Sequence, residues 1–180
     1  LALVNGTSFM TAFALDALVA AKRLRTRAEE LTAWIYRLVG AHPSPLDARL
    51  HQVRGHTGQI ESARGIRAAL EQQGGLQPDP TRPLQEVYSI RCAPQWLGAS
   101  FEQLCYAERL LHAEVHGVSD NPILLASPHE DPVALHGGNF QGTQVAFGAD
   151  AINGALTHIG LLAERQLDAV ISPSLNAGAP

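Results

Sequence analysis

The sequence predicts a mostly α-helical protein, a bundle of long helices with one small β-hairpin. Apolar residues recur at spacings of three and four over long stretches, strand-like patterns are confined to one short segment, and Gly or Pro ends the helical stretches. With 180 residues, 46% of them hydrophobic, the chain is long enough to bury a core. Residues 1–180 are therefore treated as a single domain.

The first half of the chain contains two predicted helices. The first covers residues 8–40 and ends at a glycine. Residues 41–57 are predicted to be a loop, and residues 58–73 form a shorter helix closed by a pair of glycines. The stretch 76–94 contains four prolines and is predicted to be a long loop that carries site residues, because loops of this length are often functional.

Two further long helices are predicted in the second half, separated by a hairpin. The first covers residues 95–118 and the second covers residues 140–171. Residues 123–126 and 133–135 flank a turn that contains Pro, which predicts the hairpin. The apolar face of the first helix comprises Leu97, Phe101, Leu104, Leu111, Val115 and Val118. The apolar stripe of the second comprises Val145, Ala149, Ile152, Leu156, Ile159, Ala163, Leu167 and Val170.

Both apolar stripes are interpreted as core positions of a bundle. A repeat of three and four residues over this length indicates near-parallel helix packing. The predicted helices are also well above the usual length in globular proteins. We therefore expect a large bundle that is shared between subunits.

The composition argues against several classes of function. The formal net charge is −4 and no cluster of Lys and Arg is present, so no nucleic-acid partner is expected. No apolar run approaches the roughly 20 residues needed to cross a bilayer, so no membrane partner is expected. Two cysteines are too few for a disulfide scaffold and favour a cytoplasmic location. Because the chain begins at Leu1 and stops at Pro180, we expect a fragment of a longer polypeptide.

Three short polar segments interrupt the apolar stretches, at residues 3–7, 85–95 and 136–142. Each places Asn, Gln, Tyr or Arg near a Gly or Pro, and helix ends are where a helical protein can build a site. In the middle segment, Tyr88 and Arg91 are three residues apart, so one helical turn would put both on one side. An arginine offers a charged fork for a carboxylate, and a nearby tyrosine can be tuned for acid–base chemistry. Taken alone, the pair is more simply a surface Arg and a half-buried Tyr.

Two other patterns are weaker candidates for a site. His112 and His116 are one helical turn apart, as metal ligands can be, but Glu114 is at the wrong offset for the zinc-protease motif. We therefore expect no metal. The Gly-rich segment 137–142 lacks the Lys-Ser/Thr of a phosphate loop, so a tight turn before a helix is the simpler interpretation. A turn alone does not require the Asn139-Phe140-Gln141 run in this segment, so the run indicates a functional role.

Six short motifs lie along the chain. They are Leu3-Val4-Asn5-Gly6-Thr7, Arg54-Gly55-His56-Thr57-Gly58-Gln59, Gln85-Glu86-Val87-Tyr88-Ser89-Ile90-Arg91, Pro94-Gln95-Trp96-Leu97-Gly98, Ser119-Asp120-Asn121-Pro122 and His136-Gly137-Gly138-Asn139-Phe140. Together they resemble the aromatic amino acid ammonia-lyase family, which comprises the histidine, phenylalanine and tyrosine ammonia-lyases and related aminomutases. Each motif alone is weakly specific, but all six come in the family's order and cover nearly the whole chain.

The resemblance implies a helical fold of the ammonia-lyase type and a homotetramer whose central helices form a shared bundle. It also implies a methylidene-imidazolone prosthetic group, an electrophile formed by cyclisation of an internal Ala-Ser-Gly. The 180 residues contain no Ala-Ser-Gly. In the family this triplet precedes the Asn-Gly-Thr motif, so we expect it upstream of Leu1. The family's catalytic tyrosine on an N-terminal loop and a downstream pocket-lining segment are expected outside the chain as well.

The resemblance also assigns roles to five residues. Asn5 resembles the asparagine that hydrogen-bonds near the electrophile and substrate, and Tyr88 resembles the tyrosine that handles protons beside the ring. These two are the candidate catalytic residues. Arg91 resembles the arginine that pairs with the substrate carboxylate, Gln85 a glutamine that supports it, and Phe140 the aromatic residue packed against the ring. We expect these side chains to converge on one pocket across neighbouring protomers.

The implied reaction is the non-oxidative elimination of ammonia from an aromatic L-amino acid, which gives an α,β-unsaturated acid. The residues of the motifs around Trp96 and Gln141 favour phenylalanine or tyrosine over histidine as the substrate. Two alternatives stay open: an aminomutase of the same family, and a non-catalytic helical assembly fragment, which the missing Ala-Ser-Gly would favour. The expected partners are the amino acid and either further copies of the chain or a companion fragment of the same protein.

Overall fold

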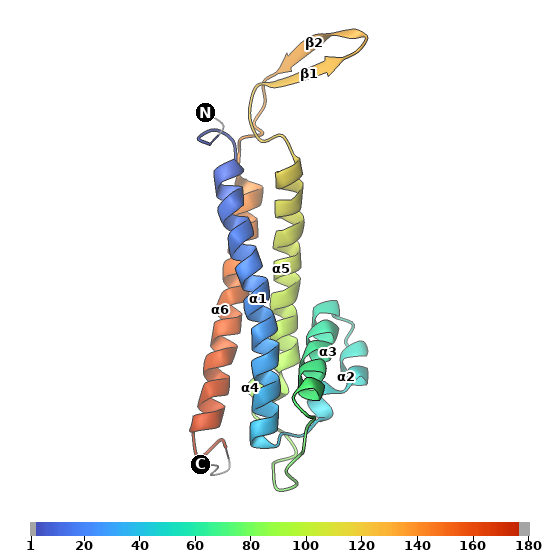
Figure 1. Cartoon of the computed structure of the whole chain (residues 1–180), viewed down its shortest axis with the longest axis vertical. Helices are drawn as coiled ribbons and strands as arrows, with labels where there is room; N and C mark the ends of the chain where they lie inside the picture. Colours follow the sequence, from blue (N-terminus) through green and yellow to red (C-terminus); the bar gives the residue numbers. More distant parts are fainter. Residues whose placement is uncertain (1–2, 177–180) are drawn as a thin grey trace.

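The computed structural model describes residues 3–176 and shows an elongated bundle of three long helices with a hairpin at one end (Figure 1). Successive long helices run in opposite directions along the long axis. The predicted fold class, mostly α with a small β-hairpin, is confirmed, whereas sharing of the bundle between subunits stays a prediction. In chain order the elements are α1 (Ser8–Val39), η1 (Ser44–Leu46), α2 (Ala48–Gln52), α3 (Thr57–Gln72), α4 (Tyr88–Arg91), α5 (Ala93–His116), β1 (Ile123–Ser127), β2 (Glu130–Leu135) and α6 (Thr143–Ile171).

The first helix, α1, matches the helix predicted for residues 8–40. It ends at Gly40, whose φ of +62° is left-handed and strains any residue that carries a Cβ. The N–H of Ala41 donates to the Tyr36 carbonyl at 2.9 Å and so closes the last turn. The chain leaves the bundle here and forms η1, α2 and α3 on its flank.

The hydrophobic core is divided into two clusters along the bundle. The cluster nearer the hairpin is built from α1, α5 and α6, with Ala14, Leu18, Ala21, Leu104, Ala107, Leu111, Val145, Ile152 and Ala155. The second lies where α3 and α4 join the long helices, and it includes Tyr36, Ile66, Ile90, Leu97, Ile159 and Leu162. Burying an aliphatic side chain of this size stabilises the fold by about 1.5–3 kcal/mol. Ile90, which is 1% exposed, therefore fixes the short helix α4 to the bundle.

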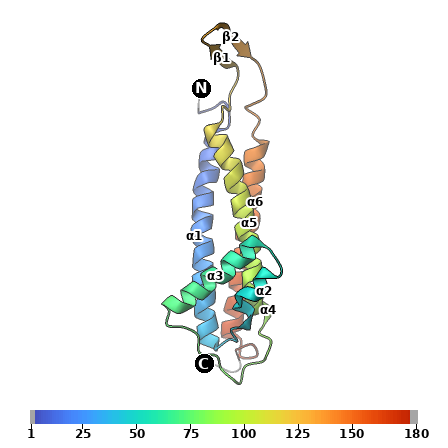
Figure 2. The ribbon, with the colours of Figure 1, turned by 90° about the vertical axis from the view of Figure 1, so that its right-hand side faces the viewer.

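Helix α3, on the flank of the bundle, crosses the long helices (Figure 2). It contacts α5 at two glycines, Gly58 on α3 and Gly98 on α5. A Cβ on Gly98 would overlap the backbone of Gln59, and a Cβ on Gly58 would overlap the Gly98 carbonyl. The two backbones can approach this closely only because neither residue has a side chain. The N–H of Gly58 also donates to Glu102 on α5 at 2.8 Å. Gly98 therefore has a packing role within its motif.

The buried stripe of α6 differs in part from the predicted one. Val145, Ile152 and Ile159 are buried as expected, but Leu167 is 59% exposed. The positions that complete the buried stripe are Gly148, Ala155, Leu162, Gln166 and Ala169, each one residue before a predicted position. The reason is that α6 packs against both α1 and α5, which turns its buried face towards this neighbouring row. On α5, Val115 is likewise exposed, as is Val118 beyond its end.

Several boundaries differ from the predicted ones. The loop expected over residues 41–57 contains η1 and α2. The loop expected over residues 76–94 ends earlier, since α4 begins at Tyr88 and α5 at Ala93. Pro94 does not break α5, because it lies in the first turn, where its missing N–H has no helical partner to lose. The last helix begins at Thr143, three residues later than predicted.

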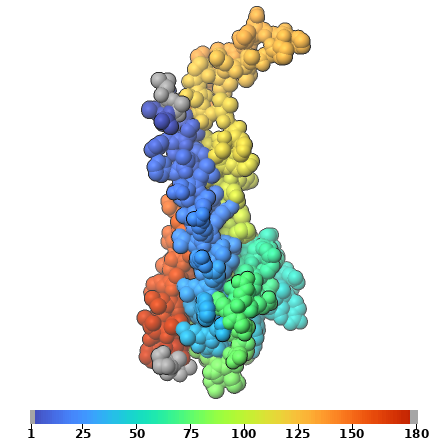
Figure 3. Space-filling model, viewed as in Figure 1, coloured from blue at the N-terminus to red at the C-terminus, as the bar shows by residue number. Residues whose placement is uncertain are grey.

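The hairpin stands clear of the bundle (Figure 3). β1 and β2 are antiparallel, and Ile123 is paired with Leu135 and Leu125 with Val133. Both strands are almost entirely exposed. Apolar side chains such as Leu124, which is 72% exposed, therefore face solvent in the single chain.

Helix α6 is both long and apolar. Within the described residues it is the one helix that meets a length and composition test for a membrane span, with a mean hydropathy of 1.2 over its best window. The buried core helix of a bundle passes the same test. Because α6 contributes side chains to both core clusters, we interpret it as a bundle helix.

Candidate functional site

The short helix α4 carries two of the three polar side chains predicted in the middle motif, Tyr88 and Arg91, and Gln85 lies in the loop before it. The Val87 carbonyl accepts from the N–H of Ile90 and Arg91, at 3.0 and 2.9 Å, which forms a single helical turn. This turn places Tyr88 and Arg91 on the same side, with the Arg91 guanidinium carbon 4.8 Å from the centroid of the Tyr88 ring. Arg91 Nη1 donates to Gln85 Oε1 at 2.6 Å. Gln85, Tyr88 and Arg91 therefore form one contiguous group, which we call the α4 group.

A groove of about 610 Å³ opens beside Arg91 and Gln85. One wall comes from the η1–α2 segment, with Ser44, Pro45, Asp47, Arg49 and Leu50, and the other from Leu84, Gln85, Arg91, Cys92 and Gln95. Arg49 is neutralised by Asp47, since Arg49 Nε donates to Asp47 Oδ1 at 3.0 Å. The Arg49 guanidinium holds the pKa of the Asp47 carboxyl well below its usual range.

Arg91 differs from Arg49 in its partners. Within the part of the chain that the structure describes, no carboxylate lies within salt-bridge distance of Arg91, and its contacts are the Gln85 amide and the Tyr88 ring. A half-buried guanidinium held by neutral groups keeps its charge available for an anion. A carboxylate in this groove would meet that charge.

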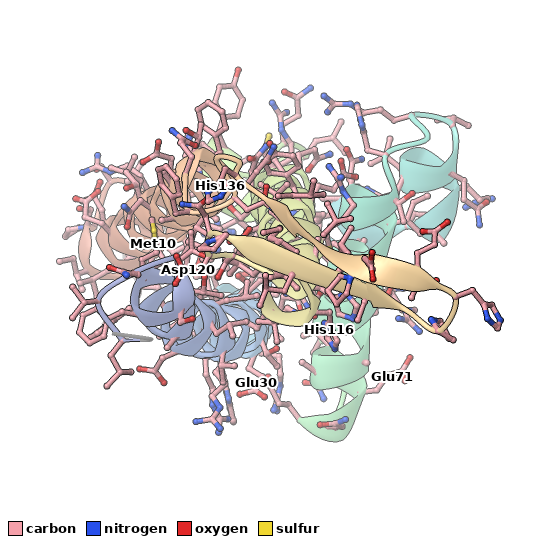
Figure 4. All side chains as sticks on the ribbon, turned by 90° about the horizontal axis from the view of Figure 1, so that it is seen from above. Met10, Glu30, Glu71, His116, Asp120 and His136 are labelled. Carbon is pink, nitrogen blue, oxygen red and sulfur yellow. The ribbon has the colours of Figure 1, made fainter. Side chains whose placement is uncertain are left out.

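The other two predicted residues lie at the opposite end of the bundle, near the hairpin. Asn5 is exposed in the turn before α1, and this turn is fixed to the end of α5, because Thr7 donates from its hydroxyl to Glu114. Phe140 is 52% exposed in the loop before α6. Asn139 Nδ2 ties this loop to the Val118 carbonyl at 3.1 Å. Figure 4 looks down on this end, where Met10, Asp120 and His136 lie near the base of the hairpin.

The structure thus divides the five predicted site residues into two groups within one chain. Gln85, Tyr88 and Arg91 precede the start of α5, whereas Asn5 and Phe140 lie near its end. The 24 residues of α5 span roughly 36 Å at 1.5 Å per residue. One copy of the chain therefore does not bring all five residues into one pocket.

A buried ion pair that was not predicted from the sequence supports the Gln85–Arg91 segment. Arg82 Nε donates to Glu86 Oε1 at 3.1 Å, and the two side chains are 5% and 1% exposed. Arg82 Nη1 also donates to the Leu175 carbonyl at 3.5 Å, so it links the loop to the segment after α6. The spacing of four residues between Arg82 and Glu86 was the available signal. It was overlooked because the prolines of this stretch predicted an irregular loop.

The two histidines of α5, His112 and His116, contact each other. The rings of His112 and His116 are stacked with centroids 4.3 Å apart, and His116 Nδ1 lies 2.8 Å from the His112 carbonyl. Across residues 3–176, no group of three His, Cys, Asp or Glu side chains is arranged to hold a metal ion. Gln85, Tyr88 and Arg91 offer an amide, a phenol and a cation.

The family model for aromatic amino acid lyases matches residues 1–180. The chain belongs to this family. It is 39% identical over 180 residues to the histidine ammonia-lyase of Paracidovorax citrulli, covering 98% of this chain and 34% of that protein. It is also 39% identical to the histidine ammonia-lyase of Burkholderia multivorans, covering 100% of this chain and 35% of that protein.

Solved structures of the family share the fold. The histidine ammonia-lyase of Trypanosoma cruzi gives a TM-score of 0.84 at 31% identity, covering 98% of this chain and 32% of that one. The tyrosine aminomutase of Streptomyces globisporus gives 0.85 at 33% identity, covering 100% and 37%. The phenylalanine ammonia-lyase of Rhodosporidium toruloides gives 0.84 at 32% identity, covering 99% and 27%. The lyase family member described here thus spans about a third of the length of the curated relatives it matches.

Proposed function

We propose that this chain forms the central part of an enzyme that eliminates ammonia from an aromatic L-amino acid to give an α,β-unsaturated acid. The observation that carries the proposal is the α4 group, in which Arg91 has neutral partners, faces a groove and lies beside the Tyr88 ring. Substrate and product both contain a carboxylate, which the Arg91 fork suits. Holding that carboxylate fixes the reacting carbons against nearby catalytic groups, and such positioning can lower a barrier by several kcal/mol.

Tyr88 is the candidate for proton transfer in this site. The residue is 71% exposed and does not line the groove, but its ring lies against the Arg91 guanidinium. A tyrosine hydroxyl can act in general acid–base catalysis when it lies within hydrogen-bond reach of the proton that is transferred. The same residue can thus serve as a base in one step and as an acid in the reverse one.

The prosthetic group implied by the family is a planar ring with carbonyl groups, and the Asn5 and Phe140 side chains have suitable chemistry to hold it. The Asn5 amide can donate to a ring carbonyl, and the Phe140 ring offers an apolar face; both are exposed at the hairpin end. When bound, the group supplies an electrophile that makes the amine a better leaving group. The chain contributes binding and orientation, and the Ala-Ser-Gly that forms the group is absent from its 180 residues.

Assembly of several copies would join the two groups of site residues. The hairpin and α4 lie at opposite ends of the bundle (Figure 1), so a copy packed antiparallel to the first would bring its hairpin end near α4 of the first copy. The exposed apolar side chains on the long helices support such packing, and they include Phe13, Trp34, Leu38, Phe147, Leu161 and Leu167. We propose a homotetramer in which each pocket takes Gln85, Tyr88 and Arg91 from one copy and Asn5 and Phe140 from others.

The motifs and the comparisons differ in which amino acid substrate they favour. The motif wording favoured phenylalanine or tyrosine, whereas the curated relatives compared above are named histidine ammonia-lyases, and the solved structures include both kinds. The comparisons therefore do not favour phenylalanine or tyrosine over histidine. We propose an aromatic L-amino acid as the substrate class, with histidine tested first.

The test is direct. The full-length protein is incubated separately with L-histidine, L-phenylalanine and L-tyrosine, and ultraviolet absorbance is followed as the unsaturated acid forms. Growth of absorbance with equal release of ammonia supports the proposal. Absence of both products with all three amino acids would refute it and leave the non-catalytic assembly fragment as the better interpretation.

An aminomutase is the second candidate, because the fold matches the tyrosine aminomutase of Streptomyces globisporus as closely as it matches the lyases. In that reaction the amine returns to the β-carbon. Chromatography of the same incubations separates the two, since a β-amino acid marks the mutase and accumulation of the unsaturated acid marks the lyase.

A further inference from the structure

Two buried side chains that do not line the groove hold the backbone of α4. Tyr36 on α1 donates from its hydroxyl to the Ile90 carbonyl at 3.0 Å, and Gln166 on α6 donates from Nε2 to the Ser89 carbonyl at 3.1 Å. Tyr36 is fully buried and Gln166 is 1% exposed. Ser89 and Ile90 are the residues between Tyr88 and Arg91, so both bonds act on the backbone that carries the candidate site.

The bond from Tyr36 adds a side-chain donor at the point where α4 ends. In a continuous helix, the Ile90 carbonyl would accept from the N–H of residue 94, but residue 94 is Pro and has no N–H. A backbone N–H at the end of α4 donates to the Ile90 carbonyl, and the Tyr36 hydroxyl donates to it as well. Burial raises the pKa of Tyr36, and the neighbouring Glu86 and Cys92 act in the same direction. The hydroxyl therefore keeps its proton and remains a donor over the physiological pH range.

The bond from Gln166 belongs to a three-helix network. Gln166 Nε2 also donates to Thr32 Oγ1 at 3.0 Å, and Thr32 Oγ1 in turn donates to the Ala28 carbonyl at 2.7 Å. This fixes the Gln166 amide between α1 and α6 while it reaches α4. Gln166 lies at a core position of α6, seven residues after Ile159. Burying its polar amide there would destabilise the fold without these hydrogen bonds.

We propose that Tyr36 and Gln166 are positioning residues for substrate binding, which set the direction in which Tyr88 and Arg91 leave α4. A four-residue helix joined to α5 has few bonds of its own, so the two outside donors define its orientation. Neither side chain lines the groove, and both act through Arg91. The effect on substrate binding rests on the proposed function, whereas the effect on the geometry of α4 does not.

The test uses Tyr36→Phe and Gln166→Met in the full-length protein, because each keeps the side-chain volume and removes the donor. Ser100→Ala is the matched control, since its buried hydroxyl also donates to a main-chain carbonyl, that of Trp96, without contacting α4. Amide hydrogen exchange in peptides that cover residues 88–92 should accelerate about tenfold in both variants, as expected for the loss of about 1.4 kcal/mol of local stability. Exchange in peptides from the middle of α5 should not change.

The second readout is a double-mutant cycle with Arg91→Lys. If Tyr36 and Gln166 act through Arg91, each variant raises the KM of the wild-type enzyme about tenfold but changes the KM of the Arg91→Lys enzyme less than twofold. A residue with only a structural role in the core would give additive effects on KM. Additive effects, or unchanged exchange at residues 88–92, would overturn the inference.

The two readouts separate the possible failures. If the wild-type protein turns over no aromatic amino acid, the proposed function fails, and hydrogen exchange alone decides whether the two side chains hold α4. If Gln166→Met does not fold, Tyr36→Phe, which removes a single oxygen atom, carries the test.

Discussion

The Arg91 guanidinium lies over the Tyr88 ring, with its central carbon 4.8 Å from the ring centroid. A cation at this distance from an aromatic face is attracted to it by about 0.5–1 kcal/mol at an exposed site. The same geometry occurs elsewhere in the chain, because Arg109 lies 5.3 Å from the Tyr106 ring on α5. Arg109 and Tyr106 do not line the Arg91 groove. Substitutions of these two residues are therefore matched controls for substitutions of Arg91 and Tyr88.

Substitution of Arg91 by Lys should weaken carboxylate binding. A point charge replaces a planar fork with parallel N–H donors, and the loss of charge-assisted hydrogen bonds corresponds to a KM increase of about 10- to 100-fold. Steady-state kinetics of the full-length protein measure this effect. Arg109→Lys is the control and should leave KM unchanged, and a KM for Arg91→Lys within twofold of wild type would remove Arg91 from carboxylate binding.

Substitution of Tyr88 by Phe should reduce turnover while leaving the fold intact. Loss of a positioned acid–base group lowers kcat by about 10²- to 10⁴-fold. The side chain is 71% exposed, so removing its hydroxyl should not change the melting temperature. Kinetics and thermal melts of Tyr88→Phe and Tyr106→Phe provide the comparison, and near-normal turnover in the former would exclude Tyr88 from the mechanism.

Substitution of Gly98 by Ala should destabilise the protein through the α3–α5 crossing. The added methyl would overlap the backbone of Gln59, and relieving such overpacking costs about 1–3 kcal/mol. A lower thermal or urea midpoint measures the loss. The matched control is Gly160→Ala on α6, where an added methyl meets open space, and equal midpoints for the two variants would contradict the packing role of Gly98.

Substitution of Glu86 by Gln should destabilise the loop before α4 strongly. Glu86 and Arg82 form a buried pair, and removal of one partner leaves a buried charge at a cost of about 3–5 kcal/mol. The double variant Arg82→Met, Glu86→Leu should be markedly less destabilised than Glu86→Gln, because it leaves no unpaired charge. The reverse order of urea midpoints would show that the pair itself supplies the stability.

Stability should fall as the pH drops below about 6.5, the ordinary pKa of histidine. Burial lowers the pKa of His51, whose Nδ1 accepts from Gln59 at 2.8 Å while Nε2 lies 3.0 Å from the Pro45 carbonyl. Below pH 6.5 the unfolded chain binds a proton at this residue that the folded chain excludes, so protonation favours unfolding. Above that pH the contribution is constant. Urea midpoints between pH 8 and pH 5 measure the trend.

The His51→Gln variant is the control for this pH dependence. It should be less stable than wild type at pH 7.5 but should lose less stability between pH 7.5 and pH 5.5. An equally steep loss in the variant would show that other groups cause the trend.

The long helices and the hairpin could be predicted from local patterns. The helix predicted for residues 8–40 was observed as Ser8–Val39, because its apolar spacing and its terminal glycine are both encoded locally. The start of α5 was harder to predict, since Pro94 signals a break unless its position within the first turn is known. The exact buried row of α6 depends on which helices pack against it, which no local pattern contains.

The candidate site was predictable in its residue types but not in its support. Tyr88 and Arg91 were identified by spacing and by resemblance, and the turn that joins them was observed. Tyr36 and Gln166 were missed because a Tyr or Gln within an apolar stripe looks like an ordinary core or boundary residue. Their importance lies in two main-chain carbonyls more than 50 positions away in the sequence, and only the fold shows that contact.

The central claim is that the α4 group binds the carboxylate of an aromatic amino acid. The most direct test is a crystal structure of the full-length protein with the unsaturated acid product bound. We predict that the acid's carboxylate accepts hydrogen bonds from Arg91, in a pocket completed by Asn5 and Phe140 from neighbouring copies. An acid bound elsewhere, with Arg91 still in contact only with Gln85 and Tyr88, would contradict the account.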